Sequence, residues 1–203
     1  MPHAETKARN RAALLLAARE VLEQSGVSGF LLEEIAARAG LTKGAVYSLF
    51  GGKLELLAAV IETDPGWWLL PDPDQIRPRG TAAALESLGR TWGKTITSVE
   101  PAARADQLAS ELELLAVALR EPVVRDRLRA QQGEYLRRVT ELLTGTTASD
   151  RKPLAEADAG RLAVRFVAAM QGLAQQYALA SVAVTTTDFA VTARSLAPHP
   201  RKP

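Results

Sequence analysis

The chain has 203 residues, of which 47% are hydrophobic and 24% are charged, and its formal net charge at pH 7 is +2. This length and apolar content are those of an ordinary globular protein with one large or two small domains and a sizeable core. The absence of cysteine excludes disulfides, thiolate catalysis and sulfur-ligated metals, and the small net charge means that a nucleic-acid partner can be argued only from where the charges lie.

The N-terminal sequence lacks the pattern of a secretory signal. Residues 1–11 are polar, and the apolar run over residues 12–18 is short and lies inside an amphipathic pattern. No stretch is apolar for long enough to span a bilayer. Together with the missing cysteines, these features predict a cytoplasmic protein with no membrane partner.

Helical spacing dominates the first third of the chain and predicts an all-α fold. A first helix is expected over about residues 6–24, ending at Ser25-Gly26. Three short helices are then expected over residues 32–39, 43–50 and 53–62, separated by Gly40 and by Gly51-Gly52. A proline-rich stretch over residues 64–80 predicts a domain boundary, or at least a long irregular link.

Beyond this link, apolar residues recur at intervals of three and four and predict amphipathic helices. The stripes of the first three helices are Leu85, Leu88, Trp92, Ile96 and Val99, then Leu108, Leu112, Leu115 and Leu119, then Leu128, Tyr135, Val139 and Leu142. A long helix is expected over residues 155–184, and a shorter one over residues 187–196, capped by Thr187 or Asp188.

The segment over residues 32–50 has the features of a helix-turn-helix. Two helices that cross at a tight turn need a small residue in the first helix and a glycine that can take a positive φ at the turn. Ala36 and Gly40 supply these. Thr42 stands where an N-cap belongs, which leaves the backbone N–H groups of the next helix free to meet a phosphate. We expect that helix to enter the major groove of DNA.

A small residue followed by a turn glycine is common in helical proteins, so a wider pattern is needed. It runs from Arg9 to Val60 and consists of Ala17-Ala18, Gly26, Ile35-Ala36, Ala39-Gly40-Leu41-Thr42-Lys43-Gly44, Tyr47-x-x-Phe50, Gly52-Lys53 and Leu56. This pattern resembles the DNA-binding domain of the TetR family of transcriptional regulators. The resemblance implies an N-terminal three-helix helix-turn-helix domain over residues 1–53 and a helical effector-binding and dimerisation domain over residues 54–203.

The resemblance also implies which residues meet DNA. Thr42 and Tyr47 would contact phosphates through their hydroxyls, and Lys53 would do so from the start of the next helix. The residues nearest the base edges would be Lys43, Gly44, Ala45 and Ser48. Lysine can bond guanine and alanine can touch a thymine methyl, but neither fixes an operator sequence. Two of these residues also have a simpler interpretation that involves no DNA contact. Tyr47 could be a half-buried core aromatic, and Lys53 could be a solvated residue at the start of a helix.

Three positions depart from the family pattern. Phe30 stands where relatives carry a threonine that caps the second helix and bonds a phosphate, so we expect one backbone contact to be missing. Leu49 replaces a common histidine or tyrosine, and Leu54 replaces a common acid. Because phosphate binding is spread over many groups, these changes weaken single contacts and leave the assignment intact.

In the family, a ligand lies among the middle helices and dimers form through the last two. The candidate ligand-binding residues are the aromatic ones and an adaptable methionine: Trp67, Trp68, Trp92, Tyr135, Phe166, Tyr177 and Met170. Polar candidates at the stripe edges are Arg104, Gln107, Glu111 and Gln171. Glu111 either turns inward toward a cationic ligand or remains a surface carboxylate. The few inward charges favour an apolar or amphipathic effector.

Small residues in the penultimate helix would let a second helix approach closely, which favours a homodimer, although alanine is also simply a good helix former. A dimer can read two half-sites of a palindromic operator. The sequence therefore predicts a transcriptional repressor whose partners are double-stranded DNA, a second copy of itself and a small effector, with no cofactor, metal or catalytic residue.

Two other functions compete with this one. An enzyme would need a nucleophile, a base or a metal cluster, yet both histidines, His3 and His199, lie near the chain ends and no catalytic motif occurs. The other candidate is a DNA-binding dimer that responds to no effector. The sequence is also compatible with an activator of transcription, because one chain does not reveal whether DNA binding lowers or raises transcription.

Overall fold

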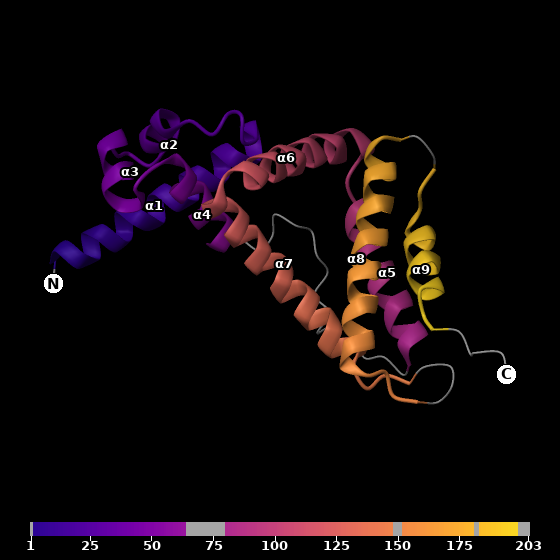
Figure 1. The fold of residues 1–203 in the computed structure, drawn as a ribbon. Helices are drawn as coiled ribbons and strands as arrows, with labels where there is room; N and C mark the ends of the chain where they lie inside the picture. Colours follow the sequence, from indigo (N-terminus) through magenta and orange to yellow (C-terminus); the bar gives the residue numbers. More distant parts are fainter. Residues whose placement is uncertain (1, 64–79, 148–151, 181–182, 199–203) are drawn as a thin grey trace. The chain divides into compact units, whose positions relative to one another are not determined.

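The computed structural model describes residues 2–63, 80–147, 152–180 and 183–198, which form helices joined by turns and loops without a named β-strand (Figure 1). The predicted all-α class is therefore confirmed. The chain divides into two compact units. The first unit consists of Met1–Trp67 and Ala109–Gln131, and the second unit of Trp68–Leu108 and Gln132–Pro203. The domain boundary proposed between residues 53 and 54 falls inside the first unit.

The first unit is built from α1 (Pro2–Ser25), α2 (Leu32–Arg38), α3 (Lys43–Phe50), α4 (Lys53–Thr63), and parts of α6 (Pro101–Arg120) and α7 (Pro122–Leu143). Leu14, Ala18 and Leu22 recur every four residues on α1 and are all fully buried. In α4 every residue from Leu56 to Ile61 is buried, so this helix forms the centre of the unit. The predicted ranges of α2, α3 and α4 differ from the observed ones by at most one residue.

The described residues contain no single helix that is both long and apolar enough to cross a membrane. Only α3 and α4 taken together reach that length and composition, and they are bent by 67° at the break between them.

The predicted apolar stripe of α6 is wrong in its orientation. Leu112, Leu115 and Leu119 are 51%, 45% and 69% exposed, whereas Leu114 and Ala118 are buried. Both faces of this helix carry apolar residues at helical spacing, so periodicity alone does not reveal which face is covered. The face with Leu114 and Ala118 packs into the core of the first unit, and the face that carries the three leucines is exposed.

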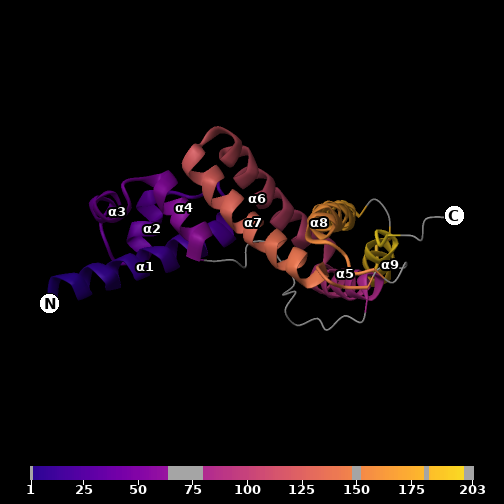
Figure 2. The same cartoon turned by 60° about the horizontal axis from the view of Figure 1, so that its bottom comes forward.

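The second unit contains α5 (Thr81–Thr97), α8 (Glu156–Ala178) and α9 (Thr186–Ser195), which lie side by side in both views (Figures 1 and 2). The closest approach is between α5 and α9. A Cβ atom added at Gly89 would lie 2.4 Å from the carbonyl oxygen of Phe189 and 2.5 Å from the Cβ atom of Ala193. Gly93, one turn later on α5, is similarly close to Phe189. The two glycines therefore form the surface on which the backbone of α9 rests.

Two predicted details at the C-terminal end are wrong. The long helix ends at Ala178 and not at Val184, because the chain turns at Ala180, which has a φ of +47°. No proline or glycine marks this end in the sequence. The N-cap of α9 is Thr185, and not Thr187 or Asp188. Asp188 instead completes a capping box by accepting a hydrogen bond from the backbone N–H of Thr185 at 2.7 Å.

Candidate nucleic-acid interface and effector site

The turn between α2 and α3 has the geometry that its sequence predicts. Gly40 has a φ of +66°, a left-handed conformation that residues with a Cβ rarely adopt. The backbone N–H of Leu41 then donates to the carbonyl oxygen of Ala36 at 2.8 Å, which closes the turn. Thr42 is the N-cap of α3, as predicted, and its hydroxyl oxygen accepts from the backbone N–H of Ala45 at 3.3 Å. The hydroxyl proton of Thr42 stays available to a further acceptor.

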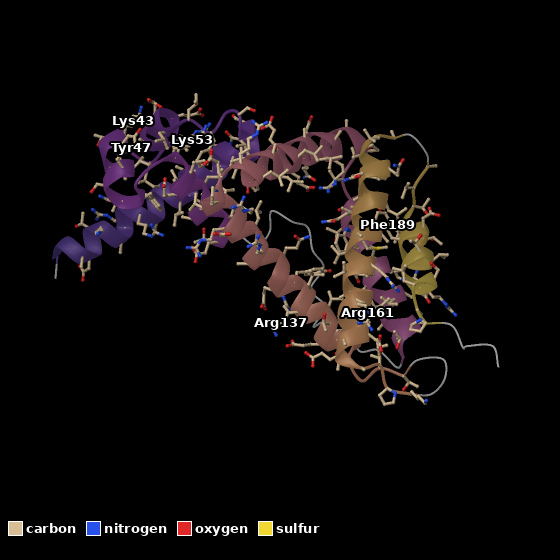
Figure 3. All side chains as sticks on the ribbon, in the orientation of Figure 1. Lys43, Tyr47, Lys53, Arg137, Arg161 and Phe189 are labelled. Atoms are coloured by element: carbon tan, nitrogen blue, oxygen red, sulfur yellow. The ribbon has the colours of Figure 1, made fainter. Side chains whose placement is uncertain are left out.

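The two faces of α3 differ sharply in exposure. Val46 is fully buried and anchors the helix to the first unit. The residues assigned to DNA lie mainly on the open face: Thr42, Lys43, Gly44, Tyr47 and Ser48 are exposed, and Ala45 is half-buried. Tyr47 is 51% exposed, and Lys53 is exposed at the start of α4 (Figure 3). The structure thus brings all seven assigned residues to α3 and the helix ends beside it, while their contacts with DNA stay a prediction.

Lys43 is engaged within the protein by a residue that sequence analysis missed. Its ammonium group donates to the carboxylate of Glu33 on α2, at 2.5 Å, and lies 6.0 Å from the centre of the Tyr47 ring. The hydrogen bond raises the pKa of Lys43 and lowers that of Glu33. Both side chains are solvent-exposed, so the pair is weak in water, but the carboxylate competes with any anion for Lys43.

We expect Glu33→Gln to increase DNA affinity several-fold at low salt, because it releases Lys43 and removes a negative charge beside the phosphates. The measurement is a fluorescence-anisotropy titration of labelled duplex at two salt concentrations. Glu34→Gln is the matched control, since it makes the same charge change one residue away, where the carboxylate pairs with Arg38 at 2.8 Å. Equal gains in the two variants would show that only net charge matters and that Glu33 does not restrain Lys43.

The start of α2 differs from the start of α3. Its N-cap is Leu31, and no side-chain cap hydrogen bond is found there in the described structure. Phe30, at the position where the resemblance implies a capping threonine, is fully buried in the core. Residue 30 is therefore a buried apolar side chain, where the resemblance implies a threonine that caps α2 and contacts a phosphate. This is the departure that the sequence indicates.

Part of α6 supports the loop between α1 and α2. The carboxylate of Glu113 accepts a hydrogen bond from the backbone N–H of Ser28 at 3.0 Å, and this bond lowers the pKa of Glu113. A Cβ added at Gly26, in the same loop, would lie 3.1 Å from that carboxylate. On α7, Arg127 pairs with Glu62 of α4 at 3.2 Å. These residues, 85 and 65 positions apart in the chain, carry no local sequence signal and were not predicted.

The ligand-binding candidates divide into three groups. Trp92, Tyr135, Phe166 and Met170 are all buried in the core of the second unit. The ring of Trp92 meets those of Tyr135 and Phe166 edge-on, with centroids 6.0 and 5.8 Å apart. Glu111 belongs to the first unit, where it is half-buried on the same face of α6 as Leu114 and Ala118. Trp67 and Trp68 lie outside the described residues.

The two tyrosines of the second unit differ in their hydrogen bonding. The Tyr177 hydroxyl donates to the carbonyl oxygen of Val99 at 2.7 Å, so this former ligand-binding candidate has no hydroxyl proton left to donate to a ligand. The Tyr135 hydroxyl is buried, and no described group of the protein hydrogen-bonds to it. Burial raises the pKa of Tyr135 far above its usual value, so this hydroxyl stays protonated.

Comparison with known proteins identifies the N-terminal region. Residues 14–60 match the sequence model of the bacterial regulatory proteins of the tetR family. Over 51 residues the chain is 51% identical to the HTH-type transcriptional regulator SrpR of Pseudomonas putida, a match that covers 25% of this chain and 24% of SrpR. Over 54 residues it is 44% identical to the HTH-type transcriptional repressor BepR of Brucella suis biovar 1 (strain 1330), covering 27% of this chain and 26% of BepR. The matches thus span about a quarter of the length of these relatives.

Solved structures extend the likeness to the whole fold. The multidrug binding protein EbrR in complex with proflavin shares 21% sequence identity with this chain, at a TM-score of 0.63 over 92% of this chain and 99% of EbrR. At this identity the likeness establishes the fold and leaves the ligand undefined. The predicted architecture, with an N-terminal helix-turn-helix domain followed by a helical body, is confirmed. Sequence pattern and domain match thus agree that residues 14–60 are similar to the bacterial regulatory proteins of the tetR family, and the fold of the whole chain fits that likeness.

Proposed function

We propose that this protein is a transcriptional repressor that binds a palindromic operator as a homodimer and releases it when a small, apolar or amphipathic effector binds. The observation that supports DNA binding most directly is the open face of α3. Its N-terminus is capped by Thr42, its apolar side is anchored by Val46, and the side that carries Lys43, Tyr47 and Ser48 is exposed. A helix held in this way can enter a major groove with its first residues facing the bases.

The assigned residues suit this role individually. The Thr42 hydroxyl keeps a proton to donate to a phosphate oxygen, and the backbone N–H groups at the start of α3 favour an anion. Tyr47 and Lys53 are exposed and present a hydroxyl and an ammonium group for the same purpose. On α1, the guanidinium of Arg11 lies 4.4 Å from the centre of the Phe50 ring, which places a further cation at the C-terminal end of α3.

The variant Gly44→Ala tests whether the glycine at this position is needed for folding or for DNA binding. Nothing in the described structure opposes a Cβ at Gly44, since the nearest atom would be the Thr42 hydroxyl oxygen at 3.6 Å. The variant should be as stable as the parent, or more stable by up to about 1 kcal/mol, because alanine is the better helix former. If the backbone of α3 approaches base edges, the added methyl group should weaken operator binding about tenfold or more. Thermal denaturation and anisotropy titrations measure the two effects.

Gly133→Ala is the matched control for this substitution. Gly133 is also helical, no described atom lies within 4 Å of its Cβ position, and it belongs to the second unit. It should gain the same stability and retain full DNA affinity. Unchanged DNA affinity in Gly44→Ala would mean that the N-terminal end of α3 does not face the groove.

The outer face of α8 supports the homodimer. Val164, Ala168, Gly172 and Leu179 lie on one helical stripe and are exposed or half-buried, with Val164 at 55% and Leu179 at 67%. No described atom lies within 4 Å of the Cβ position of Gly172, so a second helix could approach closely there. Val191 on α9 is also 60% exposed. These are the features of a helix-on-helix interface, while Ala174 and Ala178 face the core instead.

The buried aromatic cluster of the second unit supports an effector site, because ligand sites are lined mainly by apolar and aromatic groups with few polar ones. The helix α6 contributes residues to both units, and its Glu113 accepts the hydrogen bond from Ser28 in the first. Release of DNA requires a coupling free energy of the usual order, about 1–3 kcal/mol.

Selection of bound sequences from random DNA tests this function. The expected product has two-fold symmetry, with half-sites about one helical turn or a multiple of it apart. An effector found by thermal-shift screening should then lower operator affinity. A selected site without symmetry would contradict the dimer, and an effector that binds at saturation without changing operator affinity would contradict release.

A further inference from the structure

The Tyr135 hydroxyl is a buried polar group that forms no hydrogen bond with any described group of the protein. Tyr135 is 6% exposed, and its ring is fixed edge-on against Trp92. A buried hydroxyl that forms no hydrogen bond destabilises the folded state, so buried polar groups of this kind are rare and need an explanation. Tyr177, whose hydroxyl is satisfied by Val99, shows that the same unit can accommodate a tyrosine in the ordinary way.

One charged group acts on this hydroxyl. The charged group that acts on Tyr135 is the guanidinium of Arg138, one turn along α7, which opposes the rise in the tyrosine pKa. Arg104, which is not among the groups that act on Tyr135, is 5% exposed and is the one buried charged residue among those the structure describes in the second unit. No carboxylate is buried among the described residues of this unit. A cationic ligand would therefore lose its hydration here without gaining a counter-charge.

We propose that the effector site takes an uncharged aromatic molecule with one hydroxyl or carbonyl oxygen, which accepts a hydrogen bond from Tyr135 while its ring lies against Trp92 and Phe166. This inference rests on the proposed effector function and defines its ligand class. It sets the protein apart from EbrR, whose crystallised ligand, proflavin, is an organic cation. Met170, fully buried in the same cluster, supplies the adaptable side chain that a ligand of variable outline needs.

The test uses three fused-ring aromatic probes: 2-naphthol, which is uncharged and carries one oxygen, naphthalene, which has the same two rings and carries none, and the cation proflavin, which has three rings. Calorimetric titration of the full chain should give the order 2-naphthol, naphthalene, proflavin, from tightest to weakest. Tyr135→Phe should weaken 2-naphthol binding about three- to tenfold, the effect of one hydrogen bond, and leave naphthalene binding unchanged. The variant should also melt no lower than the parent, because it removes an unpaired buried hydroxyl.

Tyr177→Phe is the matched control. It removes a satisfied hydroxyl, so it should lower the melting temperature and leave the ratio of 2-naphthol to naphthalene affinity unchanged. Tighter binding of proflavin than of 2-naphthol, no binding of 2-naphthol, or an unchanged ratio in Tyr135→Phe would each overturn the proposal. If proflavin, and not 2-naphthol, releases operator DNA, the repressor function stands and only the ligand class fails. If no operator is bound at all, the proposed function itself fails.

Discussion

Gly89→Ala should destabilise the second unit by about 3 kcal/mol and lower its melting temperature by roughly 10 °C. The added methyl group would lie 2.4 Å from the carbonyl oxygen of Phe189, and a backbone atom in the middle of a helix cannot move aside independently. To relieve the clash, α9 must separate from α5, and Phe189, which is fully buried, must leave its place in the core (Figure 3). Thermal denaturation followed by circular dichroism measures the change.

Gly133→Ala serves again as the control, because it makes the same chemical change in the same unit with no described atom within 4 Å. Its stability should rise slightly, by up to about 1 kcal/mol. If the two variants melt at the same temperature, the close approach of α5 and α9 contributes nothing to the stability of the unit.

Lys53→Ala should weaken DNA binding about a hundredfold at moderate salt, because a dimer loses two charge-assisted contacts of about 1.5 kcal/mol each. The loss should be the same for operator and for unrelated duplexes, since a phosphate contact carries no base information. The slope of log affinity against log salt should fall in magnitude by about two, one for each protomer. Anisotropy titrations on both duplexes over a salt series give affinity and slope together.

Lys94→Ala is the charge-matched control for this prediction. Lys94 is exposed on α5 in the second unit, so its removal changes the net charge equally without touching the α3 region. Its salt slope should match that of the parent protein. A Lys53→Ala slope that also matches the parent would make Lys53 a solvated helix start, and a slope reduced by one would argue against a dimer on the operator.

The helix-turn-helix was predictable because its determinants are local. Gly40 sets the turn, Thr42 caps α3, and Ala36 allows the crossing, and all of these lie within seven residues of one another. The capping box at Thr185 and Asp188 is equally local and was predictable in principle, but the run of three threonines obscured which one is the N-cap. The Gly89-x-x-x-Gly93 spacing likewise signals close helix packing, although it does not name the partner.

The remaining features depend on residues far apart in the chain. The hydrogen bond from Ser28 to Glu113 and the pairing of Glu62 with Arg127 need the tertiary fold before they can be recognised. The orientation of α6 depends on which face its neighbours cover, and a helix with leucines on two sides does not specify that by itself. In the candidate effector site, Trp92, Tyr135 and Phe166 lie on the apolar faces of their helices, as helical spacing predicts. The lack of a hydrogen-bond partner for the Tyr135 hydroxyl could not be predicted from the sequence.

The division of each unit between two separate stretches of chain has a consequence for biosynthesis. The first unit includes Ala109–Gln131, so the unit that carries the helix-turn-helix cannot be complete until the ribosome has translated residue 131. The second unit waits longer, because α5 needs Phe189, a hundred residues after Gly89, to cover its glycine surface. A nascent chain would therefore leave the glycine surface of α5 uncovered from the translation of residue 97 until that of residue 189, and the first unit would be complete earlier. For the same reason, a fragment cut after α4 would lack the Glu113 and Arg127 contacts that complete the intact first unit.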